Sequence, residues 1–97
     1  MQVLVIAGIA EGISAEQVMP YISAEAAAVW NAYAADTLRT IHYIADMSGA
    51  VLLWEAPSVE VVEEALAKFP MIAQGLLKCE IIALKPYTGI ASLFTQQ

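Results

Sequence analysis

The chain has 97 residues, of which 60% are hydrophobic and 14% charged, and its net charge is −6. This length favours a single domain, because a second core would be built from fewer residues than usually fold alone. The acidic balance and the four scattered basic residues exclude nucleic acid as a partner, since phosphate is repelled. No run reaches the ~18–20 apolar residues of a membrane helix. The start of the chain has no secretory signal pattern, so we expect a cytoplasmic protein with no membrane partner.

The hydrophobic fraction is high for a small soluble protein, in which roughly 45–50% is usual. A compact domain of this size cannot bury that much apolar surface by itself, so the excess predicts a subunit interface, an apolar pocket, or both. We therefore expect a homodimer or a higher homo-oligomer. The single cysteine, Cys79, lies in an apolar strand pattern and is interpreted as a small buried hydrophobe.

The first half of the chain predicts one strand and one broken helix. Val3 to Ala7 form an apolar run typical of a strand. Ser14 has a glutamine three residues later, which is the spacing of a helix N-cap. Pro20 interrupts this helix, so we expect a break near residues 19 to 22. Ser23 offers a second N-cap for a main helix from Ala24 to Ala35.

The second half predicts a hairpin, a helix and a last strand. Leu38–Ala45 and Ala50–Ala56 are strand-like and flank a turn with Gly49. Ser58 is a predicted N-cap for a helix that ends at Phe69 before a proline, and 77 to 84 form the last strand. The order β-α-β-β-α-β predicts an α+β, ferredoxin-like sandwich with an antiparallel sheet. Residues 89 to 94 form an apolar C-terminal segment that we expect to pack on a neighbour.

Two residues of the second predicted strand suggest a carboxylate-binding pair. Arg39 and Tyr43 are four residues apart, so strand alternation places them on one face. A guanidinium binds carboxylate through two hydrogen bonds, and the phenol adds a neutral donor. The alternative is a structural salt bridge from Arg39 to Asp46 or Glu55.

Three further residues are candidates for chemistry. His42, the only histidine, suits acid–base work near neutral pH, or it packs at an interface. Glu55 lies among apolar residues. If it faces the barrel, burial raises its pKa and it suits proton abstraction; the alternative is a Glu55 at the strand end that is solvated or paired with Arg39. Trp54 can line an aromatic ligand pocket or fill the core. One histidine without nearby ligands predicts no metal site, and no cofactor motif is present.

The stretches 38–46 and 49–56, then 63–66 with Phe69-Pro70, and 84–87 resemble the muconolactone-isomerase-like proteins of the dimeric α/β-barrel superfamily. The resemblance covers residues 3 to 94. It implies two ferredoxin-like sheets packed face to face as a homodimer, a small-molecule pocket in each subunit, and a C-terminal segment that reaches the partner.

For activity, the resemblance implies a cofactor-free isomerase acting on a small organic molecule with a carbonyl or carboxylate group. The YCII-like group is a second relative, but its aspartate before a proline is replaced by Phe69 here, so that chemistry is not implied. Two alternatives stay open. One is a non-catalytic binding or assembly module, and the other is a cofactor-independent monooxygenase, an activity found in some proteins of this fold.

Overall fold

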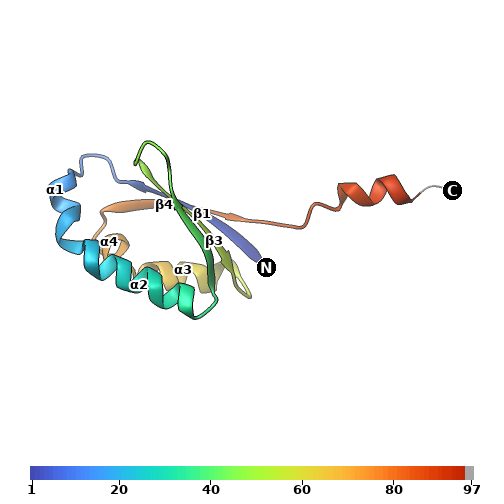
Figure 1. Ribbon diagram of the computed structural model, residues 1–97, viewed down its shortest axis with the longest axis horizontal. Helices are drawn as coiled ribbons and strands as arrows, with labels where there is room; N and C mark the ends of the chain where they lie inside the picture. The colour runs from blue at the N-terminus through green and yellow to red at the C-terminus, as the bar shows by residue number, and fades with distance from the viewer. Residues whose placement is uncertain (96–97) are drawn as a thin grey trace.

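A computed structural model describes residues 1–95. One four-stranded antiparallel sheet has the order β2-β3-β1-β4, and helices lie over one of its faces (Figure 1). The strands are β1 (Gln2–Ile9), β2 (Leu38–Tyr43), β3 (Gly49–Glu55) and β4 (Leu77–Ala83), and the α-helices are α1 (Ala15–Val18), α2 (Ile22–Ala34), α3 (Val59–Ala67) and α4 (Pro70–Ala73). The predicted ferredoxin-like α+β fold is confirmed.

The first helical region is broken at the predicted place. The Ser14 amide donates a hydrogen bond to Gln17 Oε1 at 2.8 Å at the start of α1, and the 3₁₀ turn η1 (Met19–Tyr21) then joins α1 to α2. The prediction that Ser23 caps the second helix is wrong, because α2 begins at Ile22. Ile22 already has helical angles (φ −57°, ψ −49°), so η1 runs directly into α2 and Ser23 lies inside its first turn.

The second half differs from the prediction mainly at its turns. β2 stops at Tyr43 rather than Ala45, because Ile44 begins a turn in which its carbonyl accepts from Met47 N at 2.8 Å. The Ser58 cap is confirmed, since its hydroxyl accepts a hydrogen bond from Val61 N at 3.3 Å. Beyond α3, Pro70 opens the short helix α4, where its missing N–H is not required.

The core lies between the sheet and the helices. Alternate residues of β1 are buried, and the ring of Trp54 on β3 packs against Phe69 with ring centroids 6.0 Å apart. The opposite face of the sheet also carries apolar side chains, but no helix of the described chain lies over it (Figure 1). We call this the open face; its half-buried apolar residues are Leu4, Ile6, Val51, Leu53 and Ile82.

The C-terminal segment leaves the body of the domain. After β4 the chain runs out in extended form to a second 3₁₀ turn, η2 (Thr88–Phe94), and the longest dimension reaches 62 Å (Figure 1). Its large apolar side chains are exposed, with Phe94 at 79% and Leu93 at 69%. We call residues 86 to 95 the tail. Among the described residues, no helix has the length and apolar character to span a membrane.

Candidate functional site

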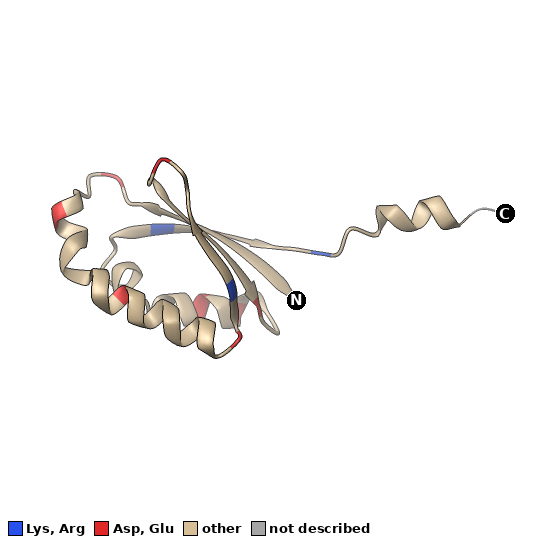
Figure 2. Ribbon diagram, in the orientation of Figure 1, with Lys and Arg blue, Asp and Glu red and all other residues tan. Residues whose placement is uncertain are grey.

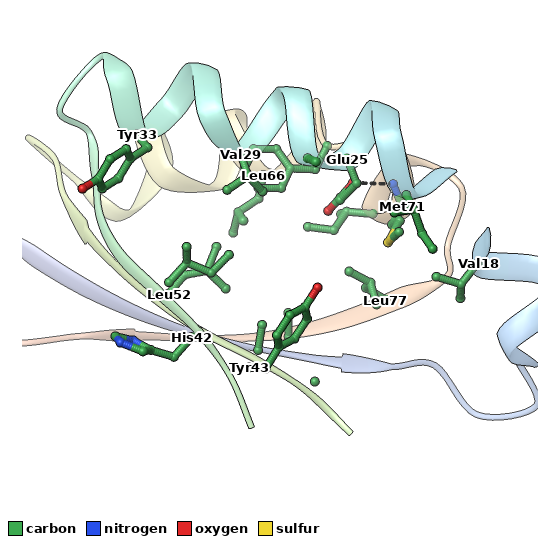
Figure 3. A pocket seen from close by; sticks show the side chains of 18 of the residues that line it. Val18, Glu25, Val29, Tyr33, His42, Tyr43, Leu52, Leu66, Met71 and Leu77 are labelled. Atoms are coloured by element: carbon green, nitrogen blue, oxygen red, sulfur yellow. Dashed lines mark hydrogen bonds between the residues drawn. The ribbon is translucent and has the colours of Figure 1, made fainter. Parts of the chain in front are cut away.

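A cleft of about 890 Å³ lies between α2 and the helix-covered face of the sheet. Its lining is mainly apolar, with side chains from α2, from the sheet and from the α3–α4 end of the molecule (Figure 3). Trp30, Tyr33 and Tyr43 line it and are at least half exposed, so the cleft opens to solvent along α2 and the edge strand β2.

Small residues on the sheet create this space. In one row across the strands, Ala50 and Ala7 lie between Tyr43 on β2 and Cys79 on β4. The neighbouring row holds Ile41, Leu52, Val5 and Ile81, whose larger side chains fill the corresponding volume. Since protein interiors are otherwise close-packed, two alanines side by side leave room for a ligand.

Glu25 places a carboxyl group in this apolar cleft. It lies in the first turn of α2, is half-buried, and its Oε1 accepts a hydrogen bond from the Met71 amide at 2.9 Å. Burial raises the pKa of Glu25 above its ordinary value, and the Met71 hydrogen bond opposes that shift with a smaller effect. Burial likewise raises the pKa of the Cys79 thiol, and the negative charge of Glu25 adds to it.

Glu25 was not among the residues selected from the sequence. An acidic residue in the first turn of a helix is ordinarily explained by the helix dipole. A signal was nevertheless present, because Ala28, Val29 and Ala32 of the same helix pack on the core. Glu25 stands three, four and seven residues before them and therefore continues the inward-facing stripe of α2. A carboxyl in such a stripe is costly to bury and so marks a site.

Arg39 and Tyr43 both line the cleft, but at different ends. A register shift between Leu38 and Thr40 marks a β-bulge at Arg39, and Arg39 Nε donates to the Asp36 carbonyl at 2.9 Å just beyond α2. Tyr43 points into the cleft from the opposite wall to Glu25 (Figure 3). Four strand residues span about 13 Å, so the two side chains provide a cation at one end and a phenol at the other. Glu25 and Arg39 thus bring opposite charges into one cleft. Glu25 is the single acidic residue of α2, which has one red segment in Figure 2.

Glu55 lies away from the cleft. It ends β3 on the open face, beside Gln2 of β1, and its Oε2 forms an ion pair with the Met1 ammonium at 2.8 Å. This is the strand-end position that the sequence analysis gave as the alternative, and the hydrogen bond from that ammonium lowers the pKa of Glu55 instead of raising it. No salt bridge from Arg39 to Asp46 or Glu55 is found within residues 1–95, and Asp46 accepts from the Ser48 amide at 2.9 Å in the β2–β3 turn.

His42 and Trp54 also have positions of their own. His42 lines the β2 rim, but it pairs with Val51 on the open face and its ring turns away from the cleft (Figure 3). Trp54 is 1% exposed and belongs to the core, where its indole Nε1 has no hydrogen-bond partner within residues 1–95. His42, Asp46 and Glu55 do not converge on one site, because Glu55 is the last residue of β3 and Asp46 lies in the turn before its first residue. Within the described residues no group of three potential metal ligands is found.

Comparison with known proteins identifies solved structures that resemble this chain. No family model matches the chain, and no curated protein matches it. Among solved structures, muconolactone isomerase superposes with a TM-score of 0.74 at 17% identity, covering 90% of this chain and 91% of that one. The chain has the fold of muconolactone isomerase.

A second solved structure shares that fold. It is the 5-chloro-2-hydroxyhydroquinone dehydrochlorinase of Burkholderia phenoliruptrix AC1100, in complex with 2,5-dihydroxybenzoquinone. The TM-score is 0.75 at 19% identity, with coverage of 92% of this chain and 98% of that one. The resemblance to muconolactone isomerase expected from the sequence is therefore confirmed at the level of the fold.

Proposed function

We propose that the cleft binds a small, largely apolar organic molecule bearing a carbonyl or carboxylate group, and that Glu25 exchanges a proton with it in a cofactor-free, isomerase-like reaction. The carrying observation is a half-buried carboxyl group with a raised pKa in a cleft whose other walls are mainly apolar. Ligand sites typically combine an apolar lining with a few convergent polar groups. A general base works best when its pKa lies near the operating pH, and burial moves a carboxyl in that direction.

The proposed reaction is a proton shift beside a carbonyl group. The Glu25 carboxylate removes a proton from the carbon next to the carbonyl, and the C–H electron pair forms a carbon–carbon double bond as the carbonyl oxygen gains the negative charge. The Tyr43 phenol, which points into the cleft, donates a hydrogen bond to that oxygen. The substrate for this step carries a carbon–carbon double bond between the second and third carbons from the carbonyl. Glu25 returns the proton to the third carbon, the carbonyl re-forms, and the double bond moves next to the carbonyl without any change in oxidation state.

Arg39 keeps the substrate-binding role suggested by the sequence. Its guanidinium lies at the other end of the cleft and can pair with a carboxylate of the bound molecule. Glu25 takes the base role considered for His42 or Glu55, because the side chains of those two residues face away from the cleft. Trp54 contributes by packing beneath the site rather than by touching the ligand.

The test is solvent deuterium exchange into small unsaturated ketones, lactones and quinones, combined with binding measured by NMR. The wild-type protein should bind a subset of them and introduce deuterium next to the carbonyl. Glu25→Gln should keep binding and lose exchange, whereas Glu16→Gln, which removes an exposed carboxyl on α1, should match the wild type. Equal exchange rates in Glu25→Gln and wild type would contradict the proposal. Binding without exchange favours a binding module, and oxygen consumption with quinols favours a monooxygenase.

A second copy of this chain is the proposed partner. The centre of the open face is apolar, with charged side chains such as Glu55, Lys78 and Glu80 towards its edges, and the tail extends from the domain with no charged residue between 86 and 95. A two-fold pair that packs the open faces together buries the same surface in both copies. The fold shared with muconolactone isomerase supports this arrangement. Light scattering after size exclusion should give at least twice the mass of 10.4 kDa, and a monomeric mass would contradict it.

A further inference from the structure

One hydrogen bond joins α2 to α4 across the inner end of the cleft. The Met71 amide donates to Glu25 Oε1 at 2.9 Å, although the two residues are 46 positions apart in the sequence. Figure 3 shows this bond beside the cleft, with the second carboxyl oxygen of Glu25 pointing into the open space. The contact therefore divides the carboxyl into a tethered oxygen and a free one.

The local backbone makes the Met71 amide available. Phe69 is extended (φ −71°, ψ 126°) and Pro70 begins the turn, so the first amide hydrogen of α4 belongs to Met71. Amides in the first turn of a helix have no intrahelical acceptor. The following amides of Ala73 and Gln74 instead close the turn onto the carbonyls of Phe69 and Pro70, at 2.8 and 3.0 Å. Met71 can thus satisfy its amide only with a group from outside the turn, and Glu25 supplies it.

The direction of this hydrogen bond decides where a proton can lie. An amide N–H only donates, and in a neutral carboxyl group the carbonyl oxygen is a better acceptor than the hydroxyl oxygen. The bond from the Met71 amide therefore favours the proton of neutral Glu25 on the free oxygen, which faces the cleft. In the charged state the same free oxygen is the one available to accept a proton.

We propose that the Met71 amide is the positioning group for Glu25: it tethers one carboxyl oxygen, so that the other is always the one that gives a proton to, or takes it from, the bound molecule. This inference rests on the proposed function, because it assigns the geometry of the same acid–base group. Burial and the amide act on the Glu25 carboxyl in opposite directions, so the tether also moderates the raised pKa. Within the described residues, the titratable and charged groups around Glu25 are the Cys79 thiol on β4 and the cleft-lining side chains of Tyr33 on α2 and of Arg39, His42 and Tyr43 on β2.

The decisive experiment replaces the Met71 amide by an ester in the full-length chain. Chemical ligation at the Lys78–Cys79 junction allows segments 1–78 and 79–97 to be synthesised, with a ¹³C label in the Glu25 carboxyl. The ester keeps the Met71 side chain and removes the N–H. It also makes the Pro70 carbonyl a weaker acceptor for the Gln74 amide, which the control below takes into account. An NMR titration of the labelled carboxyl should give a midpoint pH higher than that of the wild type. The reason is that the hydrogen bond from the Met71 amide, which lowers the pKa of Glu25, is lost.

An ester at Gln74 is the matched control. It removes one hydrogen bond of the same turn, the 3.0 Å contact to the Pro70 carbonyl, without touching Glu25. Both esters should lower the melting temperature by a similar amount, but only the Met71 ester should shift the Glu25 titration. A folded Met71 ester with the wild-type midpoint would overturn the inference.

A recombinant measurement keeps the inference testable if the ester protein does not fold. The ¹⁵N and ¹H shifts of the Met71 amide should follow the same midpoint as the Glu25 carboxyl in the wild type, and should show no such transition in Glu25→Gln. A Met71 amide that is insensitive to Glu25 ionisation would overturn the proposal. Neither titration requires a ligand, so the failure to find a substrate is distinguished from the failure of the tether. Where exchange activity is found, its pH profile should move upward with the Met71 ester.

Discussion

The two faces of the sheet present different kinds of incomplete packing. On the helix-covered face, the row Tyr43, Ala50, Ala7 and Cys79 has small residues at its centre, and a cleft results. On the open face, Val51 and Ile6 occupy the corresponding central positions, directly next to those alanines in sequence, and no helix of the described chain covers them. On the helix-covered face, the side chains of these strands leave part of the interior volume empty. On the open face, the same strands leave apolar side chains uncovered. The first condition suits a small ligand, and the second suits another protein surface.

The largest effect is expected at Trp54, compared with its neighbour Leu53 on the opposite face. Trp54→Ala should lower the free energy of unfolding by about 3–5 kcal/mol, because a buried indole leaves a cavity. Leu53→Ala should cost the isolated subunit less, since its side chain is only half-buried. Denaturant unfolding at one fixed protein concentration measures both. Equal losses at the two positions would show that the two faces are packed alike in solution.

Leu53→Lys is expected to break the association of two copies. A lysine at the centre of the open face would have to be buried without a partner when two sheets meet, which should weaken dimerisation by about 100-fold. Sedimentation or light scattering over a concentration series measures the dissociation constant. Ala67→Lys on the exposed side of α3 adds the same single positive charge outside the open face and should leave the mass unchanged. A dimer that persists in Leu53→Lys would place the interface elsewhere.

Ala50→Leu should close the cleft while leaving the fold intact. The larger side chain would occupy the space above the alanine row, so binding of a small molecule should weaken by about tenfold or more. The melting temperature should change little, because the added group fills an existing space. Ala34→Leu at the exposed end of α2 is the control for added apolar surface. Unchanged binding in Ala50→Leu would show that the ligand lies elsewhere.

The accuracy of the sequence-based prediction depended on how local each cause was. Strand alternation, the Ser58 cap and the Pro20 break are set by residues a few positions apart, and all three were predicted correctly. Glu25 was missed because its meaning depends on the amide of Met71, 46 residues away. Simple alternation also gave no sign of the bulge next to Arg39, which changes where that side chain lies relative to Tyr43.

A smaller, pH-dependent effect is expected at Glu25. Its pKa is raised in the folded state, so its contribution to stability is complete below the ordinary value of 4.5 and is lost as the pH rises through the folded-state pKa. Glu25→Gln cannot ionise, so the wild type should lose stability relative to this variant as the pH increases. Thermal unfolding across that pH range measures the difference. A constant difference at all pH values would mean that Glu25 is not desolvated in the folded protein.

The smallest effect is expected at Glu55, where the sign is opposite. The Met1 ammonium lowers the pKa of Glu55, so this carboxyl contributes stability above its unfolded pKa and loses it as the pH falls through the folded-state value. Both partners are about a third or more exposed, at 35% and 40%, so water and salt weaken the ion pair. Glu55→Gln should therefore lower the melting temperature slightly near neutral pH, with the difference vanishing in acid and in high salt. A loss in Glu55→Gln that persists in high salt would contradict this prediction. It would indicate that the ion pair is shielded from solvent, which is the result expected if a second copy covers that end of the sheet.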